Sequence, residues 1–152
     1  MNHLSLKCEV RKGSENQVER KFHDFIVDGE SLLKRFNSLG YADYVSVLGC
    51  DSWNDPVSIH NTAQEQLLAK SKSDLPDDFI PLFICPECGD KHCGMIKFKI
   101  EKKENQITWS DFYYDNFIEY DKGSEAIAID IGPFIFSWDD YSKTIKEAKL
   151  CA

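Results

Sequence analysis

Hydrophobic and polar residues alternate at the start of the chain. Residues 4–10 place Leu, Leu, Cys and Val at every second position, which is the period of a half-buried strand. A turn with Gly13 follows, and residues 18–27 are expected to return as the second strand of a hairpin. The large hydrophobic residues of this second segment do not fall on one face, so its pattern is less regular than that of the first.

Two segments in the first half of the chain have helical spacing instead. Hydrophobic residues over 32–39 predict a helix that begins at Asp28-Gly29 and stops at Gly40. Thr62 and Glu65 form a capping-box pair ahead of two leucines, which predicts the start of a second, short helix.

The second half of the chain is rich in alternating segments. Further strands are expected over residues 44–48, 79–85, 96–100, 107–114, 127–131 and 134–138. Ser137 and Asp140 are placed to cap a last helix, whose inner face would be Tyr141, Ile145 and Ala148. Because the strands arrive mostly as hairpins and helices are few, we expect an α+β fold, a mainly antiparallel sheet with two to three short helices packed on it, in a single domain spanning residues 1–152.

Charge excludes one class of partner. The 152 residues include 18 basic and 26 acidic side chains, a net charge of −8, and a negative surface repels phosphate backbones. The basic clusters, at Lys97 to Lys103 and at Arg11-Lys12, are expected to be solvated strand ends and turns. Nucleic acid is therefore not an expected partner.

The compartment follows from hydropathy. No apolar run reaches the about 20 residues that span a bilayer. Residues 1–10 alternate and do not form the hydrophobic block of a secretory signal. The sequence thus predicts a cytoplasmic protein without a membrane partner, in which the six cysteines are reduced thiols or metal ligands and not disulfides.

The segment Cys85-Pro-Glu-Cys-Gly-Asp-Lys-His-Cys-Gly94 is the strongest candidate for chemistry. Three thiols lie within nine residues, and the Pro and Gly between them favour a tight turn of the zinc-knuckle type. Zinc takes four ligands at a structural site, so Cys85, Cys88 and Cys93 would need a fourth, for which the candidates are His92, Asp90 and the more distant Cys50 and His60. A second Cys-x-x-Cys is missing downstream, where the next cysteine is Cys151, expected at a frayed C-terminus.

Three interpretations of this loop stay open. The loop is a structural zinc site, a redox pair of Cys85 and Cys88, or a tight connection whose thiols only pack in the core. Zinc is the one cofactor that the sequence suggests.

The second half of the chain resembles a known family. The run Phe83-Ile-Cys-Pro-Glu-Cys-Gly-Asp, the following Cys93-Gly94, the segment Ile107-Thr-Trp-Ser-Asp-Phe and the later Gly132-Pro-Phe-Ile-Phe are similar to a family of small uncharacterised bacterial proteins. Members of that family are sometimes labelled oxidoreductases. The resemblance implies a cytosolic bacterial protein, and it carries no established catalytic residue over to this chain.

An aromatic and acidic segment is the candidate for partner binding. Between residues 109 and 120, six aromatic side chains alternate with acidic ones. Such a segment suits the recognition of a basic protein, since Trp and Tyr anchor interfaces and fixed charge steers encounter. Its candidate residues are Trp109, Asp111, Tyr113, Asp115 and Glu119. The alternative is a strand with core aromatics and a solvated acidic edge.

Apart from its thiols, the sequence contains no motif that indicates an enzyme. His23-Asp24 and Cys50-Asp51 are neighbours in sequence, which is not the through-space arrangement of a catalytic triad. The leading hypothesis is therefore a non-catalytic protein-binding module, for example an immunity-type inhibitor of a basic partner. The alternative is a zinc-binding protein or a thiol oxidoreductase centred on Cys85, Cys88 and Cys93.

Overall fold

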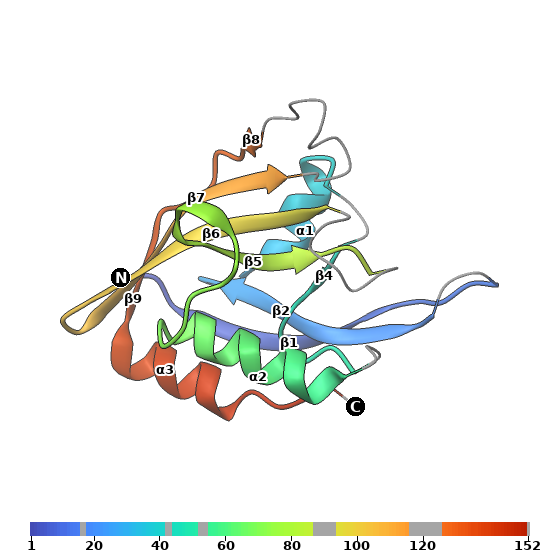
Figure 1. Ribbon diagram of the computed structural model, residues 1–152, viewed down its shortest axis with the longest axis horizontal. Coiled ribbons are helices and arrows are strands. Elements are labelled where there is room, and N and C mark those ends of the chain that lie inside the picture. Colours follow the sequence, from blue (N-terminus) through green and yellow to red (C-terminus); the bar gives the residue numbers. More distant parts are fainter. Residues whose placement is uncertain (16–17, 42–43, 52–54, 87–93, 116–125, 152) are drawn as a thin grey trace.

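The computed structural model describes residues 1–15, 18–41, 44–51, 55–86, 94–115 and 126–151, which form two antiparallel sheets and three α-helices (Figure 1). The smaller sheet has the order β1-β2-β3 and consists of β1 (Leu4–Arg11), β2 (Arg20–Val27) and β3 (Glu30–Ser31). The larger sheet has the order β4-β5-β6-β7-β8, with β9 also paired to β7. Its strands are β4 (Val45–Ser46), β5 (Phe79–Ile84), β6 (Met95–Lys103), β7 (Gln106–Asp115), β8 (Ile127–Ala128) and β9 (Phe134–Ser137).

The helices are α1 (Leu32–Ser38), α2 (Pro56–Leu67) and α3 (Trp138–Glu147). A 3₁₀ turn at Pro76–Asp78 leads into β5. The expected α+β class with mainly antiparallel strands is confirmed. None of the described helices is long and apolar enough to cross a membrane.

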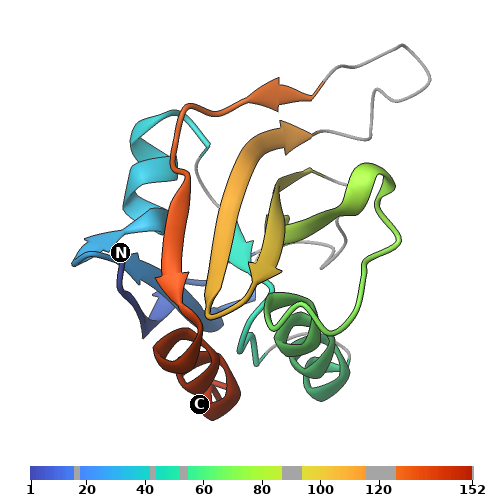
Figure 2. The ribbon, with the colours of Figure 1, turned by 90° about the vertical axis from the view of Figure 1, so that its left-hand side faces the viewer.

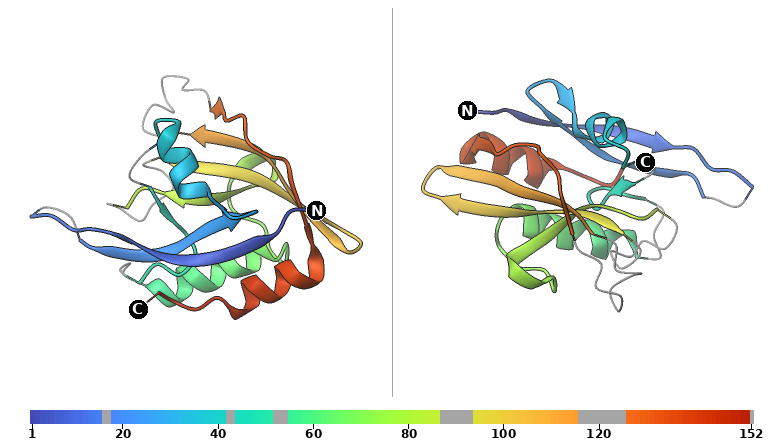
Figure 3. Two further views of the ribbon diagram at one scale, coloured as in Figure 1. Left: turned by 180° about the vertical axis from the view of Figure 1, so that it is seen from behind. Right: turned by 90° about the horizontal axis from the view of Figure 1, so that it is seen from above.

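The β1–β2 hairpin packs across the larger sheet (Figure 3). The ring of Phe25 on β2 meets the rings of Phe83 and Trp109 edge to face, at centroid distances of 5.9 and 5.6 Å. Phe22, on the opposite face of β2, is also buried. Both faces of β2 are therefore covered, which explains why its hydrophobic residues do not follow one face in the sequence.

Helices α2 and α3 lie at one end of the larger sheet (Figure 2), and Tyr141 joins them to it. The Tyr141 hydroxyl accepts the indole N–H of Trp109 at 3.1 Å and donates to the Leu67 carbonyl at 2.6 Å. Tyr141, Ile145 and Ala148 are all buried, so the inner face expected for the last helix is confirmed.

Two predicted helix starts are wrong. Asp28 and Gly29 have φ of +52° and +82° and form the turn between β2 and β3, a backbone conformation that does not begin a right-handed helix. Helix α1 starts instead behind Ser31, whose hydroxyl accepts the Lys34 N–H. The capping-box prediction at Thr62 also fails, because α2 already begins at Pro56.

The true start of α2 carries its own signals. Asp55 is the N-cap and its carboxylate accepts the Ser58 N–H at 3.2 Å, while Pro56 occupies the first turn. Further along the chain, the strand expected over residues 127–131 ends at Ala128, because Ile131 N–H turns back to the carbonyl of Ile129.

Candidate redox and metal site

The predicted cysteine loop lies largely outside the described residues. Cys85 follows β5 directly and has a half-buried free thiol. Cys88, His92 and Cys93 lie outside the described part of the chain, so a zinc site in this loop stays a prediction.

The predicted recognition surface is divided by a β-bulge. Lys97 pairs with Tyr113 and Lys99 with Ser110, so β7 has one more residue than β6 between these pairs. Asp111, at φ +56°, takes up the extra residue and is exposed. A bulge changes which side chains share a face, so simple alternation along β7 does not hold.

The five candidate residues of that surface therefore have different environments. Trp109 is 0% exposed and belongs to the core, as the alternative interpretation expected. Asp115 is 8% exposed, and its carboxylate is 2.8 Å from the ammonium of Lys97. Tyr113 is half-buried, and Glu119 lies outside the described residues. Trp109 and Asp115 do not contribute to an exposed surface.

Lys97 also corrects the prediction of solvated basic residues. Its side chain is buried, and its ammonium lies 4.5 Å from the centroid of the Phe79 ring as well as on Asp115. Lys97 lies on β6, which has β5 and β7 as neighbours. It is buried there because a carboxylate and an aromatic ring face compensate its charge.

The expectation that all cysteines are thiols or metal ligands is wrong for two of them. Cys8 on β1 and Cys151 near the C-terminus form a disulfide, with Cα atoms 5.9 Å apart and a sequence separation of 143. Cys151 is 2% exposed, so the C-terminus is not frayed at this residue, whereas Cys8 is exposed. No local pattern in the sequence connects residues so far apart.

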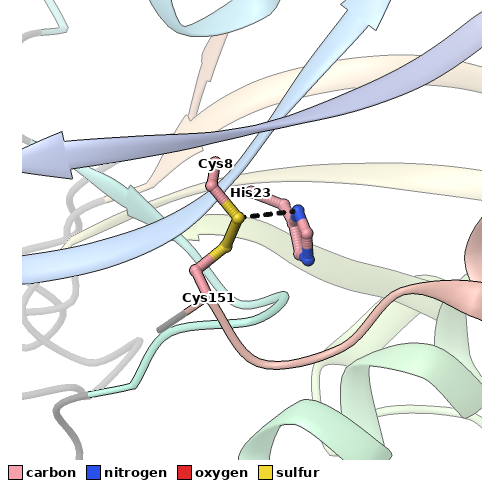
Figure 4. Close-up of side chains that lie close together, drawn as sticks. All are labelled: Cys8, His23 and Cys151. Atoms are coloured by element: carbon pink, nitrogen blue, oxygen red, sulfur yellow. Dashed lines mark hydrogen bonds between the residues drawn. A yellow bond between two sulfur atoms is a disulfide. The ribbon is translucent and has the colours of Figure 1, made fainter.

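His23 completes the cluster around the disulfide (Figure 4). It lies opposite Cys8 in the β1–β2 register, and its Nδ1 is 3.7 Å from the Cys8 sulfur. Its Nε2 is 2.7 Å from the carbonyl oxygen of Lys149. Because a carbonyl only accepts, Nε2 carries the hydrogen and Nδ1 presents its lone pair to the sulfur. Burial lowers the pKa of His23, which favours this neutral form.

A second histidine holds the tail that carries Cys151. His60 Nδ1 accepts the Gly49 N–H at 2.9 Å, and its Nε2 donates to the Ala148 carbonyl at 3.0 Å. The amide of Gln64 donates to the same carbonyl at 2.9 Å. The Cys151 N–H then donates to the Gly49 carbonyl at 2.9 Å. These bonds position the sulfur of Cys151 against β1.

Gly49 is required at this position by close contact. A Cβ on Gly49 would lie 2.3 Å from Cδ2 of His23 and 2.9 Å from its Nε2, and the residue has φ of +77°. Any side chain here would displace the imidazole ring from the disulfide.

The donor atoms of this cluster suit two chemistries, disulfide exchange and metal binding. The two sulfurs and the imidazole nitrogen lie within 4.8 Å of one another, which is close enough to hold a metal ion, and the sulfurs are at disulfide distance. A groove of about 330 Å³ lies beside the cluster, between β1 and α3, and His23 is part of its lining.

Sequence reasoning missed this site for identifiable reasons. Both predicted strands of the first hairpin are present, and their register alone would bring Cys8 and His23 together. That register could not be read from the sequence, because the second strand has no regular alternation. No rule of sequence spacing could have paired Cys151 with Cys8, because the two are 143 positions apart.

Comparisons with family models, with curated proteins and with solved structures found no match for this chain. The resemblance of its second half to small bacterial proteins therefore stays a prediction.

Proposed function

We propose that the protein is a thiol–disulfide redox protein whose reactive pair is Cys8 and Cys151. The observation that carries this proposal is the neutral imidazole of His23, oriented by the Lys149 carbonyl so that its Nδ1 lone pair faces the Cys8 sulfur at 3.7 Å. The proposal takes up the thiol chemistry that was the alternative hypothesis from the sequence and assigns it to other cysteines.

The two sulfurs have unequal roles in this chemistry. Cys8 is exposed and Cys151 is buried, so an external thiolate attacks the Cys8 sulfur. A new bond forms between the external sulfur and the Cys8 sulfur. The Cys8–Cys151 bond breaks, and its electron pair goes to Cys151, which becomes a thiolate. A second external thiolate then attacks the sulfur of the first external thiol in the mixed disulfide. The bond to Cys8 breaks, Cys8 leaves as a thiolate, and the two external thiols leave as their disulfide.

His23 is the group that activates Cys8 in the reduced protein. Its Nδ1 can accept the thiol proton, because Nε2 already carries a hydrogen that is bound to Lys149. The negative charge of the Cys8 thiolate stabilises the imidazolium of His23 beside it. This raises the pKa of His23 and so offsets the lowering of that pKa by burial. The result is a nucleophilic thiolate near neutral pH.

The rate of alkylation of Cys8 by iodoacetamide, followed by mass spectrometry from pH 5 to pH 10, tests this role. In reduced wild-type protein, Cys8 should have an apparent pKa below the value of about 8.5 of an ordinary thiol. The matched variant is His23→Gln, which keeps an N–H donor for the Lys149 carbonyl but has no basic nitrogen, and its profile should move up in pH. The proposal is refuted if Cys8 has an ordinary profile in both proteins and peptide mapping of air-oxidised protein finds no Cys8–Cys151 link.

A metal ion is a second candidate occupant of the reduced cluster. Tetrahedral zinc with sulfur and imidazole ligands places these atoms roughly 3.5 Å apart, close to the 3.7 Å between His23 Nδ1 and Cys8. A ligand histidine commonly donates its other N–H to a carbonyl, as His23 does to Lys149. Competition with a chromophoric chelator should show one more zinc ion bound by the reduced protein than by the oxidised protein, and a weaker extra site in reduced His23→Gln, because the predicted zinc loop at Cys85 is the same in both forms. Zinc binding that is equal in oxidised and reduced protein would refute this candidate.

Non-catalytic binding of a basic protein stays a further proposal. Its support is the net charge of −8 and the exposed position of Asp111 on the bulge of β7. If this surface binds, Asp111→Lys should weaken capture of the partner, and raised salt should do the same to the wild type. Capture that responds to neither change would contradict an acidic binding surface.

A further inference from the structure

The groove beside the disulfide is bordered by an edge strand. β1 has β2 as its strand neighbour in the smaller sheet, and α3 lies along its other side (Figures 1 and 3). At the start of the chain, this outer side is covered by β9, where the Asn2 N–H donates to the Ile135 carbonyl at 2.7 Å. The groove begins just after this bond, at the level of residues 3–6.

The backbone of β1 is oriented toward the groove at every second residue. The Asp28 N–H donates to the His3 carbonyl at 2.9 Å, so His3 is bonded on the side of β2. Since bonding direction alternates along an antiparallel strand, the N–H and C=O groups of Leu4 and Leu6 point to the outer side. Leu4 is 3% exposed, so of these two residues the half-buried Leu6 offers its backbone hydrogen bonds to an extended peptide in the groove.

The charged side chains of the groove are arranged around an apolar floor. Leu4 and Ala148 are buried in the floor, while His3, Glu147 and Lys149 are exposed around it. The volume of about 330 Å³ is at the lower end of the range of roughly 300–1,000 Å³ for small-ligand pockets. A ligand that carries both carboxylates and an ammonium group would match the cationic Lys149 and the anionic Glu147.

The Cys8 sulfur lies just beyond the groove, on the same strand β1. Cys8 lies two residues beyond Leu6, a distance of roughly 7 Å along a strand, and its side chain is on the same face. His23 lines the groove and faces the Cys8 sulfur, so it connects the two. A short peptide seated on Leu4 and Leu6 therefore needs about two further residue lengths to bring its own thiol to Cys8.

We propose that this groove is the binding site of a small zwitterionic peptide thiol of the glutathione class, which exchanges with the disulfide at Cys8. This proposal rests on the proposed function and adds its substrate class. The peptide thiolate attacks the Cys8 sulfur and is held as a mixed disulfide, with Cys151 as the departing thiolate. In the reverse direction the Cys151 thiolate attacks Cys8, re-forms the protein disulfide and expels the peptide thiolate, so sulfur and electrons balance in both directions.

The experiment measures formation of the mixed disulfide at Cys8 in the Cys151→Ser variant, in which that product is trapped. The reduced variant is mixed with glutathione disulfide or with cystamine, a dicationic disulfide, and the adduct is followed by intact-mass spectrometry. Each rate is divided by the rate of an unstructured cysteine peptide with the same reagent, which removes the intrinsic reactivity of the disulfide. Lys149→Glu, combined with Cys151→Ser, is the matched variant of the groove.

We expect Lys149→Glu to lower the ratio of the corrected rate with glutathione disulfide to that with cystamine by about tenfold, because a carboxylate replaces the cation at the groove while the rest of the acidic surface stays the same. A ratio unchanged by Lys149→Glu would overturn the peptide-thiol site. Reaction of Cys8 with a reduced or oxidised thioredoxin alone, and with neither small disulfide, would overturn it as well, in favour of a protein thiol.

A second measurement covers the case in which Cys151→Ser does not fold. The disulfide of the wild-type protein is reduced with glutathione or with cysteamine, and loss of the Cys8–Cys151 link is followed by mapping. The ratio of the corrected rates with glutathione and with cysteamine should again fall by about tenfold in Lys149→Glu. If the disulfide forms and is reduced reversibly but Lys149→Glu leaves this ratio unchanged, only the peptide-thiol proposal fails. If Cys8 and Cys151 never pair, the proposed redox function fails.

Discussion

Reduction of the disulfide should have a large effect on stability. Cys8 and Cys151 are 143 positions apart, so their bond closes almost the whole chain into one loop. In the chain-entropy treatment, a loop of that length stabilises the folded state by about 5 kcal/mol, and measured values commonly fall below it, so we expect about 2–5 kcal/mol. With a urea slope of about 2 kcal/mol/M for a chain of this size, the midpoint should fall by about 1–2.5 M on reduction.

Urea titration of oxidised and reduced protein, followed by tryptophan fluorescence in the presence of a metal chelator, measures this shift. Two variants serve as controls. Cys151→Ser should unfold at the same urea concentration in both conditions, because it has no disulfide to lose. Cys85→Ser, which removes a half-buried free thiol, should keep the full difference. A difference below about 0.3 M in the wild type, less than 1 kcal/mol, would refute the closure of this loop.

The other predictions concern groups around the site and in the core. Gly49→Ala should slow thiol exchange at the disulfide, since the new Cβ displaces His23, and unchanged exchange rates would contradict the close contact. Tyr141→Phe should lower the free energy of unfolding by about 1–3 kcal/mol, because a buried indole N–H and a backbone carbonyl lose their partner; a urea midpoint equal to that of the wild type would argue against this. Lys97→Met should cost about 3–5 kcal/mol by leaving a buried carboxylate unpaired, and a double variant that also replaces the carboxylate by an apolar residue should recover most of the loss in the same titration. Burial lowers the pKa of His23 and His60 below 6.5, so the unfolded chain takes up protons at a higher pH than the folded one; the urea midpoint should therefore fall between pH 7.5 and pH 5.5, and a flat profile would contradict this.

Much of the fold was predictable because its signals are local. The hydrophobic and polar residues of β1 and β6 alternate in the sequence, a pattern that needs no knowledge of the rest of the chain, although it did not reveal that Lys97 on β6 is buried. Where both faces are covered, as in β2, or where Asp111 inserts a bulge into β7, that pattern breaks down. The errors at Asp28 and Thr62 have a similar origin, since each sequence fits a helix start that the neighbouring chain does not use.

The candidate site was less predictable than the fold. The most prominent motif, at Cys85, drew attention to cysteines that are close in sequence. The pair that the structure joins comes from opposite ends of the chain, held by His23 and His60, which had no motif at all. Spacing rules detect ligands on one turn or loop, and a disulfide between distant segments leaves no such record.

Periodicity and length were thus sufficient for the α+β class and the hairpins, because each is a repeat over neighbouring residues. The pairing of Cys8 with Cys151, the lone pair of His23 and the burial of Lys97 arose only when the tail crossed β1 and the sheets closed on each other. These properties depend on distances between segments far apart in sequence, and those distances are a consequence of packing the whole core.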